Sequence, residues 1–390
     1  MKLSTHNPAH SRAMGSSITA RIATAGVAAA MALGLSVTAV GSAGAAKMSG
    51  VAKATARLDA FLKPAQWHGP TQPLHYKGLA GDKVVYISAA DSIPVLHYWS
   101  TTIKSLLMKV AGIDMTIVDA NSNIANASAG FDQAIAMGAK VIVLQALPPS
   151  LFTQKITAAH AAGIKVIVAN QGVPGQLGSG TDASVSFDYV KVGQLIGDWF
   201  VSQSKGKGKA LLVTSNDVPA SPAQAQGTLH EVKSLCPKCN VKVSDVQIAQ
   251  WASGIPTLFQ STINTDPSRK YILPLYDGQS LPGLTAIRTL NAGSKVNVGS
   301  FNATEGIVEL LKDPKSGLKL DIGGDNKWYA YAAADQIMRV LDGLTPVKNY
   351  YVGLRVFTSA NAGKLIVGTN QDRWFQDLGY IKHFKALWKP

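Results

Sequence analysis

The sequence predicts an α/β protein made of two lobes, each a doubly wound parallel sheet covered by helices. Three observations predict this fold. Short runs of apolar, β-branched residues alternate with longer helical patterns between Lys83 and Phe357. The runs are apolar throughout, as expected of strands that are buried on both faces. The alternation also falls into two successive sets of similar size, which is typical of two parallel-sheet lobes.

The first set follows a lead-in, residues 46–82, in which a short helical pattern at Val51–Leu62 precedes several prolines. Its expected strands are Val84–Ser88, Met115–Asp119, Val141–Leu144 and Val166–Ala169. The expected helices between them are Val95–Val110, Ile124–Met137 and Leu151–Ala162. A glycine follows each helical pattern, at Gly112, Gly138 and Gly163, where a C-terminal glycine is favoured.

The second set repeats the alternation. Its expected strands are Ala210–Thr214, Val241–Val246, Tyr271–Leu275, Val296–Ser300, Leu318–Ile322 and Tyr350–Phe357. Its expected helices are Val190–Ser204, Ala223–Leu235, Ile255–Asn264, Leu281–Asn291, Thr304–Leu311 and Trp328–Leu341. Parallel strands joined by helices present their carboxyl ends along one edge of the sheet, and ligands of such folds bind beyond that edge.

The N-terminus is typical of an exported protein. Residues 1–21 are polar and basic, residues 22–40 are apolar and uncharged, and Ala43-Gly44-Ala45 offers a small-residue cleavage site. This order predicts a secretory signal peptide at residues 1–45. A transmembrane anchor is the alternative, because the apolar stretch is close to the roughly 20 residues that a span needs. The many alanines and glycines favour cleavage.

Composition excludes several classes of protein. Of 390 residues, 46% are hydrophobic and 15% charged, which excludes a disordered chain. The net charge of +14 comes from scattered residues. The densest basic run, Lys205–Lys209, has no interleaved aromatic residues, so we expect no nucleic-acid partner.

The two cysteines, Cys236 and Cys239, stand in a Cys-Pro-Lys-Cys sequence. A zinc site would need two further ligands, and no second pair is present. A redox centre would place the motif at the start of a helix, whereas here it lies between a helical pattern and a strand. In an exported protein we therefore favour a structural disulfide, with a redox pair as the alternative.

Polar and aromatic side chains follow the predicted strands. They include Asp91 and Ser92, Asn170 and Gln171, Trp251, Tyr276 and Asp277, and Phe301 and Asn302. Amides both donate and accept hydrogen bonds, and rings stack on C–H faces, so such a set suits a neutral polyhydroxylated ligand. Loop caps are the alternative role for each position taken alone. We find no nucleophile elbow, zinc-protease or P-loop motif and no acid/base pair at these ends, so we expect no enzyme, no metal site and no cofactor.

At this point the chain resembles the periplasmic sugar-binding proteins of ABC importers, the type I, ribose-binding-like group. The resemblance rests on residues 88–94, 164–170, 298–302 and 321–325, in that order along the chain. It implies a three-strand hinge with crossovers near residues 186–188, 324–325 and 349–350. The implied lobes are residues 83–187 with 325–349, and residues 188–324 with 350–362, followed by a C-terminal tail at residues 363–390.

The resemblance also implies the ligand contacts. Besides the strand-end residues above, with Trp251 as the stacking ring, it adds Gln224 and Asp325. Where the family has charged groups that hold sugar hydroxyls, this sequence has mostly neutral amides, and Val95 and Leu96 replace aromatic residues near the first helix. We expect an exported, monomeric receptor that delivers a sugar, a polyol or a similar small neutral polar molecule to a membrane ABC permease. The alternatives are a receptor that presents its ligand to a membrane signalling protein, and an exported α/β enzyme.

Overall fold

The computed structural model describes residues 48–368, 371–376 and 378–390. The predicted signal peptide, residues 1–45, lies outside the described residues. Within the described part of the chain, no helix has both the length and the apolar character needed to cross a membrane.

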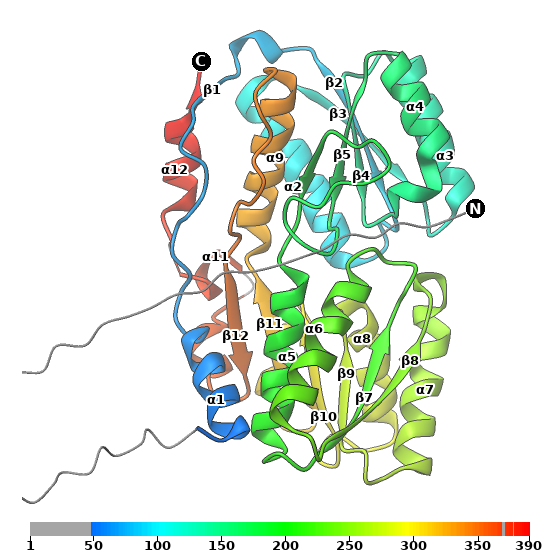
Figure 1. The fold of residues 1–390 in the computed structure, drawn as a ribbon, viewed down its shortest axis with the longest axis vertical. Helices are drawn as coiled ribbons and strands as arrows, with labels where there is room; N and C mark the ends of the chain where they lie inside the picture. Colours follow the sequence, from blue (N-terminus) through cyan, green and yellow to red (C-terminus); the bar gives the residue numbers. More distant parts are fainter. Residues whose placement is uncertain (1–47, 369–370, 377) are drawn as a thin grey trace, which may run out of the picture. The chain divides into compact units, whose positions relative to one another are not determined.

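The first lobe is built on a five-stranded sheet whose strand pairs are all parallel, in the order β3-β2-β4-β5-β6. Helices α2 and α9 cover one face of this sheet, and α3 and α4 cover the other (Figure 1). The strands are β2 (Lys83–Ser88), β3 (Asp114–Asp119), β4 (Val141–Gln145), β5 (Lys165–Ala169) and β6 (Ala183–Val185). The helices are α2 (Pro94–Ala111), α3 (Ile124–Ala136), α4 (Thr153–Ala161) and α9 (Asn326–Leu341).

The second lobe is built on a six-stranded sheet in the order β12-β11-β10-β9-β7-β8. Helices α5 and α6 lie on one face, and α7 and α8 on the other (Figure 1). The strands are β7 (Lys209–Thr214), β8 (Asn240–Asp245), β9 (Tyr271–Pro274), β10 (Asn297–Phe301), β11 (Leu318–Gly324) and β12 (Leu354–Thr358). The helices are α5 (Tyr189–Gln203), α6 (Ser221–Leu235), α7 (Trp251–Thr265) and α8 (Asp277–Thr289).

The predicted fold class of two parallel-sheet lobes is confirmed, two local predictions need correction, and one strand was missed. The last strand of the second lobe, β12, pairs antiparallel with β11. The chain returns from α9 at the carboxyl ends of the other strands of this sheet, so β12 runs in the direction opposite to theirs. The expected helix at residues 304–311 is a short 3₁₀ turn, Val308–Lys312, that follows a left-handed glycine at Gly306. Strand β6 was not predicted, since three residues are too few to show a pattern.

The chain crosses between the two sheets at three places. It passes from β6 to α5 through residues 186–188, and from β11 to α9 through Asp325. It returns from α9 to β12 through residues 342–353. The crossovers implied by the family resemblance lie at these three passages. Asp188 and Asp325 cap the helices that follow, because their carboxylates accept the backbone N–H groups of Lys191 and Trp328.

The lead-in and the C-terminal segment join the two lobes rather than trailing from them. Helix α1 (Gly50–Ala60) packs against α5, and Arg57 on it forms ion pairs with Asp198 and Glu231. Further on, the Trp67 ring stacks on Trp328 of α9 and on His383 of α12 (Tyr380–Leu387). The short strands β1 (Leu74–His75) and β13 (Trp388–Lys389) pair in parallel.

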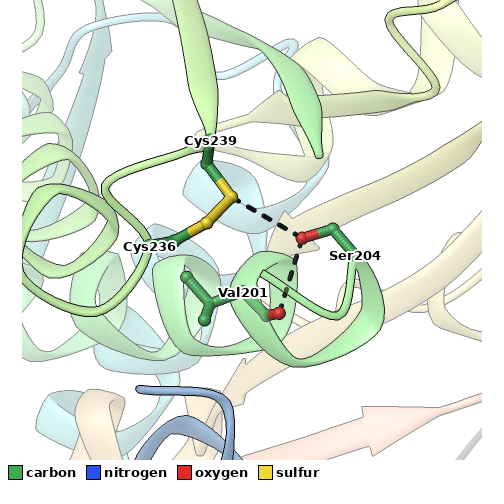
Figure 2. The surroundings of a disulfide bond; sticks show 4 residues. All are labelled: Val201, Ser204, Cys236 and Cys239. Atoms are coloured by element: carbon green, nitrogen blue, oxygen red, sulfur yellow. Dashed lines mark hydrogen bonds between the residues drawn. A yellow bond between two sulfur atoms is a disulfide. The ribbon is translucent and has the colours of Figure 1, made fainter. Parts of the chain in front are cut away.

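Figure 2 shows the two cysteines joined in a disulfide between the end of α6 and the start of β8. The Cys239 sulfur lies 3.8 Å from the Ser204 hydroxyl, just beyond the end of α5. Each sheet's ligand-binding edge is formed by the carboxyl ends of its strands, whereas the disulfide precedes β8 and therefore lies at the opposite, amino end.

Candidate functional site

A cavity lies between the two lobes, where the carboxyl ends of the strands of both sheets face each other. Its volume is about 40 Å³. Loops after β2, β4, β5, β7, β8, β9 and β10 all contribute to its wall. The lining consists of Ile93, Val95, Leu96, Trp99, Ala146, Asn170, Tyr189, Val218, Ala220, Ile248, Trp251, Tyr276, Gly278 and Asn302.

Asn170 provides an amide to this wall from the first lobe. It directly follows β5 in a left-handed conformation, with φ at +60°, which asparagine tolerates better than most residues. Its side chain is 2% exposed, and neither its amide nitrogen nor its oxygen has a hydrogen-bond partner. A buried amide without partners costs folding free energy, so it points to a molecule that binds there.

Trp99 lines the same side of the cavity from the second turn of α2. Its indole N–H donates to the side-chain oxygen of Asn326 at 3.1 Å. Asn326 in turn donates to the backbone carbonyl of Asn302 at 3.0 Å, which links α9 to the loop after β10. The indole N–H of Trp99 is therefore already paired, and Trp99 presents only the apolar surface of its ring to the cavity.

The second lobe provides Trp251 and Tyr276, whose rings stack with their centroids 5.9 Å apart. Trp251 is the first residue of α7, and its indole N–H donates to the Ser215 hydroxyl at 2.7 Å. The Tyr276 hydroxyl is buried near Ser221 but makes no hydrogen bond of normal geometry. Burial raises the pKa of Tyr276 and of Tyr189 well above the usual value for tyrosine, so both hydroxyls stay neutral.

Asn302 stands on a loop after β10 that two buried carboxyl groups hold in place. Its side-chain oxygen is buried without a partner. The next two backbone N–H groups donate to Asp321 at 3.0 Å and to Asp277 at 2.7 Å. Burial raises the pKa of Asp277 to about 6 and that of Asp321 well above its usual range, the latter also because of the nearby Asp277 charge.

The structure brings four of the sequence-predicted site residues into one cavity: Asn170, Trp251, Tyr276 and Asn302. The others lie close to it but do not line it. Ser92 lines an open hollow at the mouth of the cavity. The hollow and the cavity have four lining residues in common, Ile93, Ile248, Trp251 and Gly278.

The remaining predicted residues have partners inside the protein. The Asp91 carboxylate accepts the Ser100 hydroxyl and contacts His97 in the first turns of α2. The amides of Gln171 and Gln224 donate to the backbone carbonyls of Ala169 and Leu275. Asp277 supports the Asn302 loop, and Asp325 caps α9. Phe301 packs edge-on against Phe187 and Tyr189 in the core.

Sequence reasoning missed Trp99 and Tyr189 as lining residues. Neither directly follows a strand, so reading strand ends could not find them. Trp99 lies three and four residues after Leu96 and Val95, on the same face of α2, and this spacing is the signal that was available. Tyr189 is the first helical residue after the crossover at residues 186–188.

The described residues contain no cluster of three or more His, Cys, Asp or Glu side chains that could hold a metal ion. The polar groups in the cavity wall are amides and phenol hydroxyls. This arrangement can bind and orient an uncharged molecule.

Comparison with known proteins gives the same fold. No curated protein sequence matches this chain. Among solved structures, a 5-methylthioribose transporter solute-binding protein from Thermotoga lettingae, in complex with 5-methylthioribose, is 15% identical. It aligns with a TM-score of 0.69 over 81% of this chain and 99% of its own.

Two other structures are similarly distant. An ABC transporter solute-binding protein from Agrobacterium vitis with bound allitol is 17% identical and has a TM-score of 0.66, covering 74% of this chain and 99% of its own. A chain of the XylFII-LytSN complex is 16% identical and has a TM-score of 0.62, covering 72% and 98%. The model of the periplasmic binding protein domain matches residues 76–345. The chain therefore belongs to the periplasmic binding protein family, in its type I, ribose-binding-like group.

Proposed function

We propose that this protein is an exported solute-binding receptor that captures a small uncharged molecule between its lobes and delivers it to an ABC import permease. The observation that carries the proposal is the cavity between the lobes, in which the buried amide of Asn170 has no hydrogen-bond partner among the described residues. A ligand that bridges the lobes would supply the missing hydrogen bonds and would hold the lobes together.

The two-lobe architecture supports capture by closure. Residues 186–188, Asp325 and residues 342–353 connect the lobes, and rotation about such segments opens and closes related folds. The hollow at the mouth, next to Ile93 and Trp251, is the route by which a ligand would reach the cavity. The solved relatives with 5-methylthioribose and with allitol support a small, neutral ligand of this kind.

We place the mature protein outside the cytoplasm, in the periplasm or the extracellular space. The basic start, the apolar stretch and the Ala43-Gly44-Ala45 site support export and cleavage after Ala45. N-terminal sequencing of the exported protein should begin at Ala46, and a sequence that begins at Met1 would count against cleavage.

A second candidate function is a receptor that presents its ligand to a membrane signalling protein. The similarity to a chain of the XylFII-LytSN complex favours it. The two functions share the cavity and differ in the partner that the closed protein contacts. Crosslinking of the ligand-bound protein in cells, followed by identification of the membrane partner, separates a permease from a sensor.

The proposal is tested by a thermal-shift screen of the mature protein against neutral sugars, polyols and small metabolites. A ligand at 100 times its dissociation constant should add about 2.7 kcal/mol to the free energy of unfolding. Small-angle X-ray scattering should then show a more compact protein with that ligand, and the ligand should be recovered unchanged after incubation. A library that yields no stabilising compound, or a hit that is chemically converted, would argue against a receptor.

A further inference from the structure

We propose that the ligand of this cavity is predominantly apolar: an uncharged, compact molecule that carries only two to four hydrogen-bonding groups. This inference rests on the proposed receptor function and narrows its ligand class. It departs from the polyhydroxylated ligand that the polar residues at the strand ends suggested, because the residues that line the cavity differ from those that follow the strands.

The indole rings contribute apolar surface and no free donors. The N–H of Trp99 is taken by Asn326, and that of Trp251 is taken by Ser215, with the Val246 carbonyl also within 3.2 Å. Between these rings the wall is made of aliphatic side chains, among them Val95, Leu96 and Val218. A ligand in contact with this wall exchanges water for hydrocarbon, which favours apolar atoms.

Polar capacity in the cavity is limited to a few groups. The buried side-chain atoms without partners on its wall are both polar atoms of Asn170, the oxygen of Asn302 and the hydroxyl of Tyr276. A hydroxyl buried without a partner is costly, so a molecule with six hydroxyls would lose affinity against the aliphatic wall. A charged ligand would bind with still lower affinity, since the wall contains no Asp, Glu, Lys, Arg or His side chain to pair with its charge.

Cavity size points the same way. The cavity volume is about 40 Å³, which is room for a few water molecules or for a compact ligand. Gly278 on the wall has no side chain, and an added Cβ would come 2.7 Å from the Trp251 ring and 3.4 Å from Ile93. The glycine therefore lets the Trp251 ring pack close against the start of α8, and this ring fills the space that a side chain would take.

The test uses two matched pairs that have the same carbon skeleton and differ in the number of hydroxyls. One pair is trans-1,2-cyclohexanediol and myo-inositol, and the other is 1,2-hexanediol and allitol. Calorimetry on the mature protein should give each diol an affinity about tenfold or more above that of its hexol partner. A hexol that binds as tightly as its diol, or a protein that binds none of the four, overturns the inference.

A pair of variants locates the effect in the cavity. Val95→Thr replaces a methyl group on the wall by a hydroxyl of nearly the same size, and should reduce the preference for the diols severalfold. Val243→Thr makes the same change on β8, where the valine is 46% exposed, and should leave it unchanged. Equal effects of both variants would contradict the inference. Binding of a hexol that still makes the protein more compact in scattering would leave the receptor function intact, so the two proposals can fail separately.

Discussion

The wall of the cavity and the buried ion pair of helix α9, Asp335 with Arg339, handle polar groups in contrasting ways. Away from the cavity, Asp335 accepts hydrogen bonds from Arg339, from the Tyr350 hydroxyl and from the Trp388 indole. Arg339, which is fully buried, also donates to the backbone carbonyl of Gln72. The lead-in, through Gln72, and the C-terminal segment, through Trp388, thus supply hydrogen-bond partners to the ion pair of Asp335 and Arg339. On the cavity wall, by contrast, the amide of Asn170 is left without partners inside the chain.

This difference distinguishes buried polar groups that stabilise the fold from buried polar groups that are available to a ligand. A buried charge or amide that the chain itself satisfies stabilises one arrangement of the fold, whereas one that it leaves unsatisfied lowers stability until a ligand arrives. Substitutions in the ion-pair cluster should therefore change the free energy of unfolding. Substitutions that remove the cavity amides should lower ligand affinity without lowering the stability of the free protein.

The largest expected effect is on stability, at the ion pair. Asp335→Ala would leave the Arg339 charge buried without its partner, which should lower the free energy of unfolding by about 3–5 kcal/mol. Urea denaturation measures the loss. Asp132→Ala is the matched control, because its ion pair with Lys155 is solvent-exposed and should contribute below about 1 kcal/mol. Losses of equal size in the two variants would remove the contrast.

The next effect is on binding, at Asn170. Asn170→Gly removes the unpartnered amide and keeps a residue that tolerates the positive φ. We expect the affinity for the identified ligand to fall roughly 5- to 150-fold, which corresponds to about 1–3 kcal/mol for a lost buried hydrogen bond. Calorimetry measures the affinity, and thermal unfolding of the free protein should show little change.

Asn291→Gly is the control for this substitution. Asn291 also has a positive φ, at +50°, but it is exposed at the end of α8. Any general effect of placing glycine in a left-handed conformation should appear in both variants. A fall in affinity shared by both would show that Asn170 acts through the backbone rather than through its amide.

A third effect, on the pH dependence of stability, comes from the carboxyl pair beneath Asn302. Because the folded-state pKa values of Asp277 and Asp321 are raised, the folded protein retains protons that the unfolded chain loses above about pH 4. Their contribution to stability is therefore full below about pH 4. The part that comes from Asp277 is lost as the pH rises through about 6, and the part that comes from Asp321 is lost as the pH rises through its own raised pKa. Asp321→Asn should flatten this decline in the free energy of unfolding between pH 4 and 7, because the asparagine carries no proton to lose.

Denaturation at several pH values measures that slope. The control is Asp114→Asn, an exposed carboxylate at the start of β3, which should leave the slope nearly unchanged. The result also sharpens the contrast between the two regions, since these carboxyl groups lie under the cavity but have partners in the chain, as Asp335 does. If the decline of stability with pH were the same in Asp321→Asn as in the unchanged protein, Asp321 would not retain its proton in the folded state.

The sequence predicted the sheets better than the site. Apart from β6, apolar runs located the strands of both lobes to within a few residues, because burial on both faces leaves a strong pattern. Strand ends identified Asn170 and Asn302, but the same rule also selected Asp91, and the family resemblance added Asp325. Carboxylates at strand ends also cap or brace the following helix, and only the three-dimensional partners separate these roles. The antiparallel pairing of β12 depends on a distant crossover that no local pattern encodes.

The smallest expected effect concerns the disulfide, which belongs to neither region of the comparison. Cys236 and Cys239 close a loop of only a few residues at the amino end of β8, so their bond should contribute at most about 2 kcal/mol to stability. Replacement of both by serine should lower the free energy of unfolding by no more than this amount. The affinity for the ligand should change by no more than about twofold, because the cavity lies at the opposite end of the strands. A tenfold change in affinity would correspond to about 1.4 kcal/mol. Titration of free thiols in the denatured, non-reduced exported protein should detect none. Two titratable thiols would show that the pair is reduced, and a large fall in affinity in the double serine variant would show that the end of α6 is coupled to the cavity loop at residues 218–220.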